Sequence, residues 1–600
     1  PKHDDDLLQL CRITDGLPLA LELAAAWIDS MTLPDLVQEL QNSLDLLTRR
    51  RRGSAERHHS VRAVFDATWQ FLSDAEQKAF VQLTVFSGGF TRQAAQVVAE
   101  APLTVLSRLV GRYLVQFDRQ SGRYSLHELL RQYGAEQLQA DPSLEESVRR
   151  RHARFFGEYL THQEADLKTK NQLRALANIQ IERANIWAAC IWAAHYGDEA
   201  VSLEAMSVLV TACRLKSWIE DGYNLFGDVT RSLAPHRNGT QVLPVLLYLR
   251  VWRSLFAFWL GKLDEAPLMD ERMLLLELSS PSALRQVAAS YHVVATELTL
   301  DAGERESARR HGEQAVGLYE ALDDQWEQAN ALNQLGTVCW NVGAYTEARG
   351  YFEESLALHR QLGDMSGVAT SLDRLGLLLM HQGELEMSNR YLGEAIEANR
   401  ALGSRLGVAD VMLNYGSNLL EMGRFARARE RYLESAALYD GLGIRLLGYT
   451  VLKALTAFAS VHAGAYRRAK EEAQEAVTFS QQYGHKRSAG LALITLGMTA
   501  TALNDDETAV TYLATGARYL REINQLEELA QGLGTEALMA FHQGQIKKAK
   551  QLVLEALAIV TEIQGLWSSP SYALAAWALM LADEGDYEKS VAITRERNPF

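Results

Sequence analysis

The sequence predicts a mainly α-helical protein whose larger, C-terminal part is an α-solenoid of about nine or ten helix pairs, each about 40 residues long. Three observations predict this fold. Small residues recur every 40 to 42 positions, glycines recur where helices would end, and no proline occurs between Pro281 and Pro570. A fixed period of this length is typical of a solenoid, because one unit cannot bury its apolar face alone and must stack on its neighbours. A small helical domain and a winged-helix domain are expected before the solenoid.

The repeating unit has three columns of small residues. A lead column is followed five positions later by alanine or serine, and it is preceded seven positions earlier by another small residue. Small side chains at fixed steps let neighbouring helix backbones approach closely. The lead positions are Gly261, Gly303, Gly343, Gly383, Gly423, Gly464, Asn504, Gly544 and Gly585.

Each unit reads as a pair of helices with apolar residues at three- and four-residue steps. In residues 331–362 the turn between the two helices is expected at Gly343. The spacing resembles the tetratricopeptide repeat, and the residues that carry the resemblance are Leu335, Gly336, Gly343, Tyr345, Ala348, Phe352 and Ser355. The second helix runs further than in that family and is expected to stop at a glycine just past its end. These stops are Gly363, Gly403, Gly443 and Gly484.

Three signals stand in order in the N-terminal part. Residues 16–26 lead through a turn into an alanine- and leucine-rich helix, with Pro18 at an early helical position. Ser73 and Glu76 have the spacing of a capping box before an apolar helix. Residues 114–117 and 123–126 alternate as the strands of a hairpin, which lies between a helix and a new helix from His127. Helix, hairpin and helix in this order predict a winged-helix domain.

Together these segments resemble the end of the nucleotide-binding module of STAND ATPases, the signal-transduction ATPases with numerous domains, which include NB-ARC proteins. Residues 16–20 resemble the GLPLA motif of that family, residues 80–90 resemble its bacterial winged-helix domain, and residues 124–133 stand in place of its methionine-histidine-aspartate motif. The resulting domains are the end of the NB-ARC module with a small helical domain (1–52), the winged helix (53–142), a helical connector (143–215) and the tetratricopeptide sensor (216–600).

The resemblance implies roles for two residues. The motif proline would be Pro18, packing on adenine, and the motif histidine would be His127, reaching the β-phosphate of ADP. ADP or ATP is therefore expected in a larger parent protein, and no cofactor is expected for this chain alone. Leu126 and Glu128 replace the methionine and aspartate of the motif. A helix start for Pro18 and a helix cap for His127 are the alternative interpretations.

No catalytic residue or metal site is predicted. The phosphate-loop pattern G-x-x-x-x-G-K-[ST] does not occur in the sequence, so we do not expect this chain to hydrolyse ATP. The sequence reads as a fragment of a larger protein in which that loop would lie upstream. The histidine pair at His58 and His59 has no partner carboxylate at metal-ligand spacing.

Composition limits the partners. A net charge of −15 argues against a surface built for nucleic acid, and the basic run at 49–52 reads as a solvated linker. The four scattered cysteines, Cys11, Cys190, Cys213 and Cys339, favour a reducing cytoplasmic location. The longest apolar runs, such as 186–194, are too short to cross a membrane.

The first helices of the repeats are expected to line a concave groove that binds an inducer, either a protein or a small molecule. Its lining mixes apolar and polar residues and has no lysine–asparagine clamp for a peptide carboxylate. We expect Trp340 to be its main anchor. The predicted lining residues are Asn330, Asn333, Thr337, Trp340, Asp373, Leu377, Met380, Leu413, Ser417 and Leu420.

The function implied by the resemblance is that of the sensor and autoinhibitory portion of a STAND switch. The inducer would favour an open state, and opening would permit nucleotide exchange and self-association of the parent. Two alternatives remain. One is a tetratricopeptide scaffold without nucleotide switching, and the other is a part of a large transcriptional activator. Direct DNA contact through the winged helix is disfavoured because the helix before the wing offers only Arg108 and Arg112.

Overall fold

The structure is a computed structural model of the 600-residue chain. It describes residues 4–14, 32–42, 69, 72–112, 114–236, 242–260, 262, 282–442, 447–482, 484–563 and 571–595. Within these ranges the predicted mainly α-helical fold is confirmed. The chain divides into two compact units, Pro1–Val294 and Ala295–Phe600. The expected domain boundaries at 52, 142 and 215 stay predictions.

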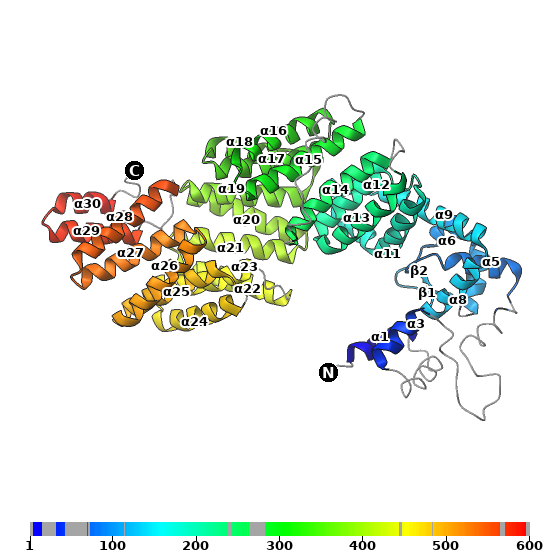
Figure 1. Ribbon diagram of the computed structural model, residues 1–600, viewed down its shortest axis with the longest axis horizontal. Coiled ribbons are helices and arrows are strands. Elements are labelled where there is room, and N and C mark those ends of the chain that lie inside the picture. Colours follow the sequence, from blue (N-terminus) through cyan, green and yellow to red (C-terminus); the bar gives the residue numbers. More distant parts are fainter. Residues whose placement is uncertain are drawn as a thin grey trace. The chain divides into compact units, whose positions relative to one another are not determined.

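The described part of the N-terminal unit is helical except for one hairpin (Figure 1). The segments that hold Pro18, His58 and the basic run at 49–52 lie outside the described residues. The elements are α1 (Asp4–Thr14), α3 (Leu33–Asn42), α5 (Asp74–Leu83), α6 (Arg92–Val98), α7 (Leu103–Gly111), β1 (Gln116–Asp118), β2 (Arg123–Ser125), α8 (Glu128–Gln139), α9 (Pro142–Thr161), α10 (Glu164–Leu167), α11 (Gln172–Tyr196), α12 (Leu203–Lys216), α13 (Ile219–Leu233), the 3-10 turn η3 (Ala234–His236) and α14 (Val242–Trp259).

The predicted capping box is present at the start of α5. The backbone N–H of Ser73 donates to the Glu76 carboxylate at 2.8 Å, and the Ser73 hydroxyl bonds the same carboxylate at 2.7 Å. The bond to the Glu76 carboxylate satisfies the backbone N–H of Ser73, a donor that the start of a helix would otherwise leave unpaired. Hydrogen bonds from Ser73 lower the pKa of Glu76, which is buried beneath them.

The predicted hairpin is also present, between α7 and α8. Its strands pair antiparallel with Phe117 opposite Tyr124. The first strand begins at residue 116 instead of 114, so that part of the prediction was wrong. The N–H groups of Leu114 and Val115 donate to the carbonyl oxygen of Leu109, at 3.0 and 3.3 Å, and these two residues therefore close α7 instead of pairing in the strand.

A buried polar network holds the hairpin against α11. Arg123 on β2 donates to the Glu182 carboxylate at 2.5 Å and to the carbonyl oxygen of Gly89 at 2.7 Å. The Asn185 side chain donates to the same carbonyl oxygen at 3.0 Å and to Glu182 at 2.9 Å, and it accepts the N–H of Ser87 at 2.8 Å. We call Ser87, Gly89, Arg123, Glu182 and Asn185 the junction network.

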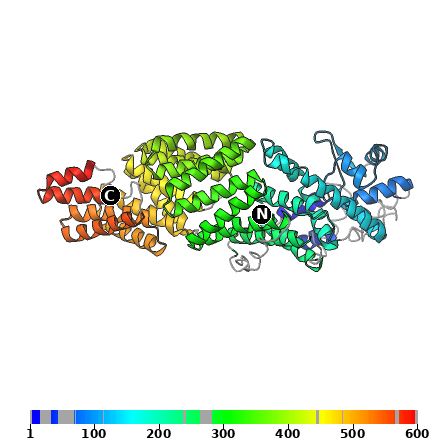
Figure 2. The same ribbon diagram turned by 90° about the horizontal axis from the view of Figure 1, so that it is seen from above.

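The C-terminal unit is a stack of helix hairpins that follow one another in chain order (Figures 1 and 2). Its described residues run from within α15 to α30. The helices are α15 (Ser282–Asp301), α16 (Arg305–Ala321), α17 (Gln325–Asn341), α18 (Tyr345–Leu362), α19 (Met365–His381), α20 (Leu385–Ala401), α21 (Arg405–Glu421), α22 (Phe425–Gly441), α23 (Leu447–His462), α24 (Tyr466–Gln482), α25 (Lys486–Ala502), α26 (Asp506–Glu522), α27 (Leu526–His542), α28 (Ile546–Ile563), α29 (Ser571–Asp583) and α30 (Tyr587–Arg595).

The recurrent glycines sit where the backbone is left-handed. Gly343 between α17 and α18 has φ of +79°, and Gly363 after α18 has φ of +72°. Glycine adopts this conformation without the steric cost that a β-carbon brings, so it ends each helix in a short loop. The predicted turns and stops are therefore confirmed where the structure describes them. The remaining left-handed residues of the series are Gly303, Asp323, Gly383, Gly403, Gly423, Gly464, Gly484, Asn504, Asn524, Gly544 and Gly585.

The other two small columns let the paired helices touch. A β-carbon on Gly336 would lie 2.6 Å from a ring carbon of Phe352, and one on Gly416 would lie 2.6 Å from the ring of Tyr432. Ala348 and Ala428 are fully buried at the second column. Because the same contacts recur in successive units, the stack is held by many equivalent small-to-large pairs.

One described helix is long and apolar enough to cross a membrane by length and composition alone. This is α14, with a mean hydropathy of 1.4 over an 18-residue window of which 61% is buried inside the fold. α14 is not an uninterrupted apolar run, because Arg250 and Arg253 lie within it. Its burial is that of a core helix, since Trp252 and Phe256 on it are fully enclosed.

Candidate functional site

Two neighbouring cavities lie among the helices of the C-terminal unit, with volumes of 280 and 380 Å³. They share Leu420, Glu421, Phe458 and Gln531, and together we call them the groove. Its walls come from six first helices, α19, α21, α23, α25, α27 and α29, with Gly423 and Phe425 added from the loop and start of α22. The groove therefore draws on five successive repeats and on the helix pair that follows them.

The helix geometry explains why these side chains point into the groove. In α19, Leu375, Leu378 and Leu379 are fully buried between helices, whereas Leu377 is half-buried on the groove side. Residues three and four apart lie on the same face of a helix, so α19 packs one face against neighbouring helices and presents another face to the groove.

The polar groups of the groove are largely paired with one another. Asn414 donates to the Asp373 carboxylate at 2.9 Å, and Arg487 donates twice to Glu528, at 2.8 and 2.7 Å. Burial raises the pKa of Asp373, although the bond from Asn414 acts in the opposite direction. A ligand would therefore meet mainly apolar walls with a few oriented amide and carboxylate groups, which is the usual make-up of a binding pocket.

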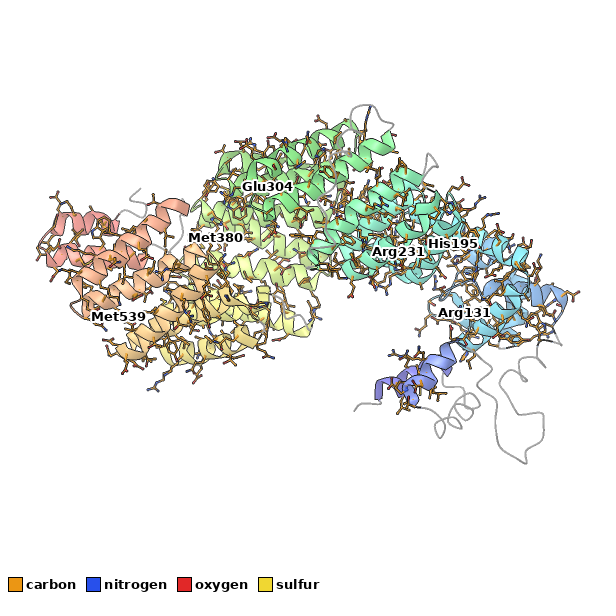
Figure 3. The ribbon with its side chains drawn as sticks, in the orientation of Figure 1. Arg131, His195, Arg231, Glu304, Met380 and Met539 are labelled. Atoms are coloured by element: carbon orange, nitrogen blue, oxygen red, sulfur yellow. The ribbon has the colours of Figure 1, made fainter. Side chains whose placement is uncertain are left out.

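Five of the ten residues predicted to contact a ligand line the groove. They come from α19 and α21, and Figure 3 shows Met380 on α19. Asp373 is tied to the groove through Asn414. Ligand contact by these side chains stays a prediction. The five lining residues are Leu377, Met380, Leu413, Ser417 and Leu420.

The four predicted residues on α17 are not among those that line the groove. Asn330 and Thr337 bond backbone carbonyls one turn earlier, at 3.0 Å each, and Asn333 donates to the Ser371 hydroxyl at 3.0 Å. Trp340 packs edge-on against His381, with ring centroids 4.8 Å apart, and rests on the core of the repeats. The structure thus gives each of these side chains an intramolecular partner, and their role toward a ligand stays a prediction.

Several groove residues were missed because the register was followed over only three units. Phe458 stands 41 positions after Ser417, at the same place in the next repeat. Gln531 and Tyr572 occupy the place in their repeats that Asn330 occupies in its own. Extending the same columns along the chain would have found them. His462 and Phe425 lie at helix ends, where the column rule says less.

His127 caps the start of α8. Its Nδ1 accepts the backbone N–H of Leu129 at 3.2 Å, and the side chain is 6% exposed. A ring nitrogen that accepts a hydrogen bond carries no proton, so the neutral ring carries its proton on Nε2. The capping interpretation is therefore realised, and contact with a phosphate stays a prediction.

No group of three His, Cys, Asp or Glu residues in the described ranges lies close enough to hold a metal ion. Cys190, Cys213 and Cys339 are buried, and burial raises the pKa of the Cys190 thiol to about 12. A thiol with so high a pKa is a poor nucleophile at neutral pH.

Comparison with known proteins identifies the repeats. The tetratricopeptide repeat family matches residues 328–362 and 367–440. Two relatives, each named "Putative HTH-type transcriptional regulator", come from Mycobacterium bovis and Mycobacterium tuberculosis. Each is 29% identical over 337 residues, which is 53% of this chain and 37% of the relative. The chain thus spans little more than a third of the length of these relatives.

Among solved structures, the chain is similar to a Signal Transduction ATPase with Numerous Domains (STAND) protein with a tetratricopeptide repeat sensor from Pyrococcus horikoshii. The TM-score is 0.53 at 15% identity, and the match covers 84% of this chain and 73% of the other. At this identity the likeness concerns the fold. The resemblance to STAND proteins with such repeats is therefore confirmed at the level of the fold. The C-terminal unit of this chain is an α-solenoid of helix pairs, and residues 328–362 and 367–440 within it match the tetratricopeptide repeat family.

Proposed function

We propose that this chain is the sensor and autoinhibitory portion of a STAND switch. An inducer binds in the groove, and binding favours ADP/ATP-controlled opening and self-association of a larger parent protein. The observation that carries the proposal is the groove itself. One bound molecule would touch helices of several repeats at once, so its binding energy would depend on how those repeats are arranged.

The N-terminal unit supplies the second support. Its helix–hairpin–helix segment places a buried histidine, His127, at the start of α8 with its proton on Nε2. An N–H in this position suits an anionic oxygen, because hydrogen bonds to charged acceptors are strong in buried sites. ADP bound by the parent would supply that oxygen as its β-phosphate, with Pro18 expected against the adenine.

A regulator of transcription is the second candidate for the parent. The relatives named as HTH-type transcriptional regulators favour it, since they match this chain over 337 residues. DNA binding would then belong to another part of the parent, and this chain would still act as the sensor. A plain scaffold, which needs no nucleotide, is the remaining alternative.

The test compares ADP retention by the full-length parent and by two variants of His127. Asparagine is a good helix cap but is not an imidazole, so His127→Asn should keep α8 intact and release ADP. We expect the affinity for ADP to fall by about ten- to one-hundred-fold in His127→Asn and His127→Ala, as measured by nucleotide release from the purified protein. His127→Ala should also lose part of its thermal stability.

Two results would contradict the proposal. Wild-type retention of ADP by the well-folded His127→Asn variant would return His127 to a capping role only. A parent that binds neither ADP nor ATP, and whose mass by light scattering never changes with nucleotide, would favour the scaffold.

A further inference from the structure

The larger cavity of the groove has an aromatic wall built from distant helices. His462 at the end of α23 stacks on Phe425 with ring centroids 5.0 Å apart, and it lies 4.4 Å from Phe458. Tyr572 on α29 approaches the same histidine at 6.0 Å. All four residues line the 380 Å³ cavity, together with Leu420 and Leu538. This volume lies within the range of about 300–1,000 Å³ that is usual for small-molecule sites.

The histidine in this wall has an unused polar atom. Its Nε2 is buried and has no hydrogen-bond partner. A buried polar atom without a partner costs free energy, so native proteins rarely keep one unless a ligand or water completes it. Burial lowers the pKa of His462 to about 4, so the ring is neutral at physiological pH.

The neutral ring limits the ligand chemistry. In a neutral imidazole one ring nitrogen donates and the other accepts, so Nε2 of His462 offers a ligand either a donor or an acceptor, and the uncharged ring does not balance a charged ligand. The other side chains with polar atoms that line this cavity are Glu421, Gln531 and Tyr572, and Glu421 already has a partner. The remaining lining is aromatic or aliphatic, which suits the face and edge of a ring.

We propose that the cavity binds a neutral aromatic small molecule that carries a hydroxyl or amino group, with the ring against Phe458 and Tyr572 and the polar group on Nε2 of His462. The inference rests on the proposed sensor function and names the ligand class of its groove. Because the walls come from α21, α23, α27 and α29, such a ligand ties repeats that are far apart in the sequence.

The test uses two probes of nearly the same shape, p-cresol and toluene, on the full chain. Calorimetric titration should show that p-cresol binds about five-fold more tightly than toluene, because the hydroxyl completes the bond to His462. In protein with ¹⁵N-labelled histidine, the Nε2 resonance of His462 should shift with p-cresol and not with toluene.

Variants distinguish the contribution of the His462 ring from that of its Nε2 atom. His462→Phe keeps an aromatic wall and should bind the two probes equally. Phe458→Leu should weaken both probes alike, since it removes a ring and no polar group. His381→Phe is the matched control, because His381 also lies at a helix end against an aromatic ring, that of Trp340, but does not line this cavity. It should keep the five-fold preference.

Several results would overturn the inference. They are binding of neither probe at millimolar concentration, an unchanged preference in folded His462→Phe, or tight binding of tetramethylammonium in place of p-cresol. Intact nucleotide switching in the parent together with any of these would remove the ligand class and leave the proposed function. If the probes bind as expected but the parent never responds to nucleotide, the ligand class stands and the proposed switch function is removed.

Discussion

Different kinds of interaction stabilise the junction network beside α11 and the stack of helix pairs in the C-terminal unit. The junction network is a single set of buried polar groups, centred on the ion pair of Arg123 and Glu182, with side chains 19% and 6% exposed. The repeats use many copies of one apolar contact, such as Gly336 against Phe352. A unique network has no neighbour to compensate for a lost member, whereas a repeated contact does. We therefore expect a single substitution to lower the free energy of unfolding more in the junction network than in the repeats.

The first prediction tests the junction by removing one charge. Arg123→Met would leave the Glu182 carboxylate buried with Asn185 as its remaining partner in the junction network, and should destabilise the N-terminal unit by about 3–5 kcal/mol. Replacing both residues with Met should recover much of this loss, because no charge is then left unpaired. Urea unfolding followed by hydrogen exchange in β2 and α11 measures both effects.

The control for this prediction is Arg174→Met on α11, the helix that also carries Glu182. Arg174 pairs with Asp166 at 2.8 Å, but its side chain is 65% exposed. Exposed pairs contribute little to stability, so this change should cost less than about 1 kcal/mol. Equal losses in Arg123→Met and Arg174→Met would mean that burial does not set the junction apart.

The second prediction uses pH on the same region. His152 on α9 contacts Phe86, with ring centroids 5.4 Å apart, and burial lowers its pKa to about 3, although a hydrogen bond with Asn185 opposes this. The unfolded chain takes up a proton near its ordinary pKa of about 6.5, and the folded unit does not. Stability is therefore full above about pH 6.5 and falls as the pH drops toward 3, by about 2 kcal/mol over the first two pH units.

A neutral replacement checks the assignment to His152. His152→Gln should flatten the pH dependence of the N-terminal unit while leaving that of the repeats, where burial lowers the pKa of His381 to about 4, unchanged. If the variant loses stability equally steeply as the pH falls, a group other than His152 causes the pH dependence.

The third prediction tests the redundancy of the repeats. Ala428→Leu would force a larger side chain into a fully enclosed site between helices and should cost about 1–3 kcal/mol. Gly336→Ala should also destabilise, because its new β-carbon would lie 2.6 Å from the Phe352 ring. Gly350→Ala is the matched control: it is mid-helix with nothing within 4 Å of a new β-carbon, and it should stabilise by about 0.5–1 kcal/mol.

Hydrogen exchange locates these effects. Loss of protection should spread from the changed helix to its neighbours and fade along the stack. Uniform loss of protection across the whole C-terminal unit would mean that the stack unfolds as one block, and redundancy would then not describe it.

The same contrast explains what the sequence could predict. The repeats were predictable because each left-handed loop and each small-to-large contact imposes the same residue type about 40 positions later, as at Gly343 and Gly383. A repeated constraint stands out against a background of variable residues. The hairpin and the capping box were predictable from local rules alone.

The junction network and the closure of the groove were not predictable in this way. Glu182 and Asn185 stand three positions apart on the buried face of α11, but nothing in this spacing indicates that Arg123 and Gly89 are their partners. The contact of His462 with Tyr572 depends on small rotations that accumulate over successive helix pairs. Such rotations leave no residue pattern at a fixed step, so the column rule gives the groove walls but not which of them meet.

The last prediction concerns the smallest effect, at the loops that all repeats share. Asn504 takes the place of a lead glycine and has φ of +58°, a conformation that costs a residue with a β-carbon more than it costs glycine. Asparagine is among the residues that tolerate it best, so Asn504→Gly should stabilise the stack by only about 0.5 kcal/mol. The reverse change at an equivalent loop, Gly343→Ala, should destabilise by about 1 kcal/mol, since its φ is +79° and alanine has no polar group to soften the strain. Thermal unfolding of both variants measures the difference. Because each loop is one of many equivalent loops, neither change should alter hydrogen exchange beyond the two neighbouring helix pairs. A loss that reached the N-terminal unit would show that the repeats and the junction are not independent.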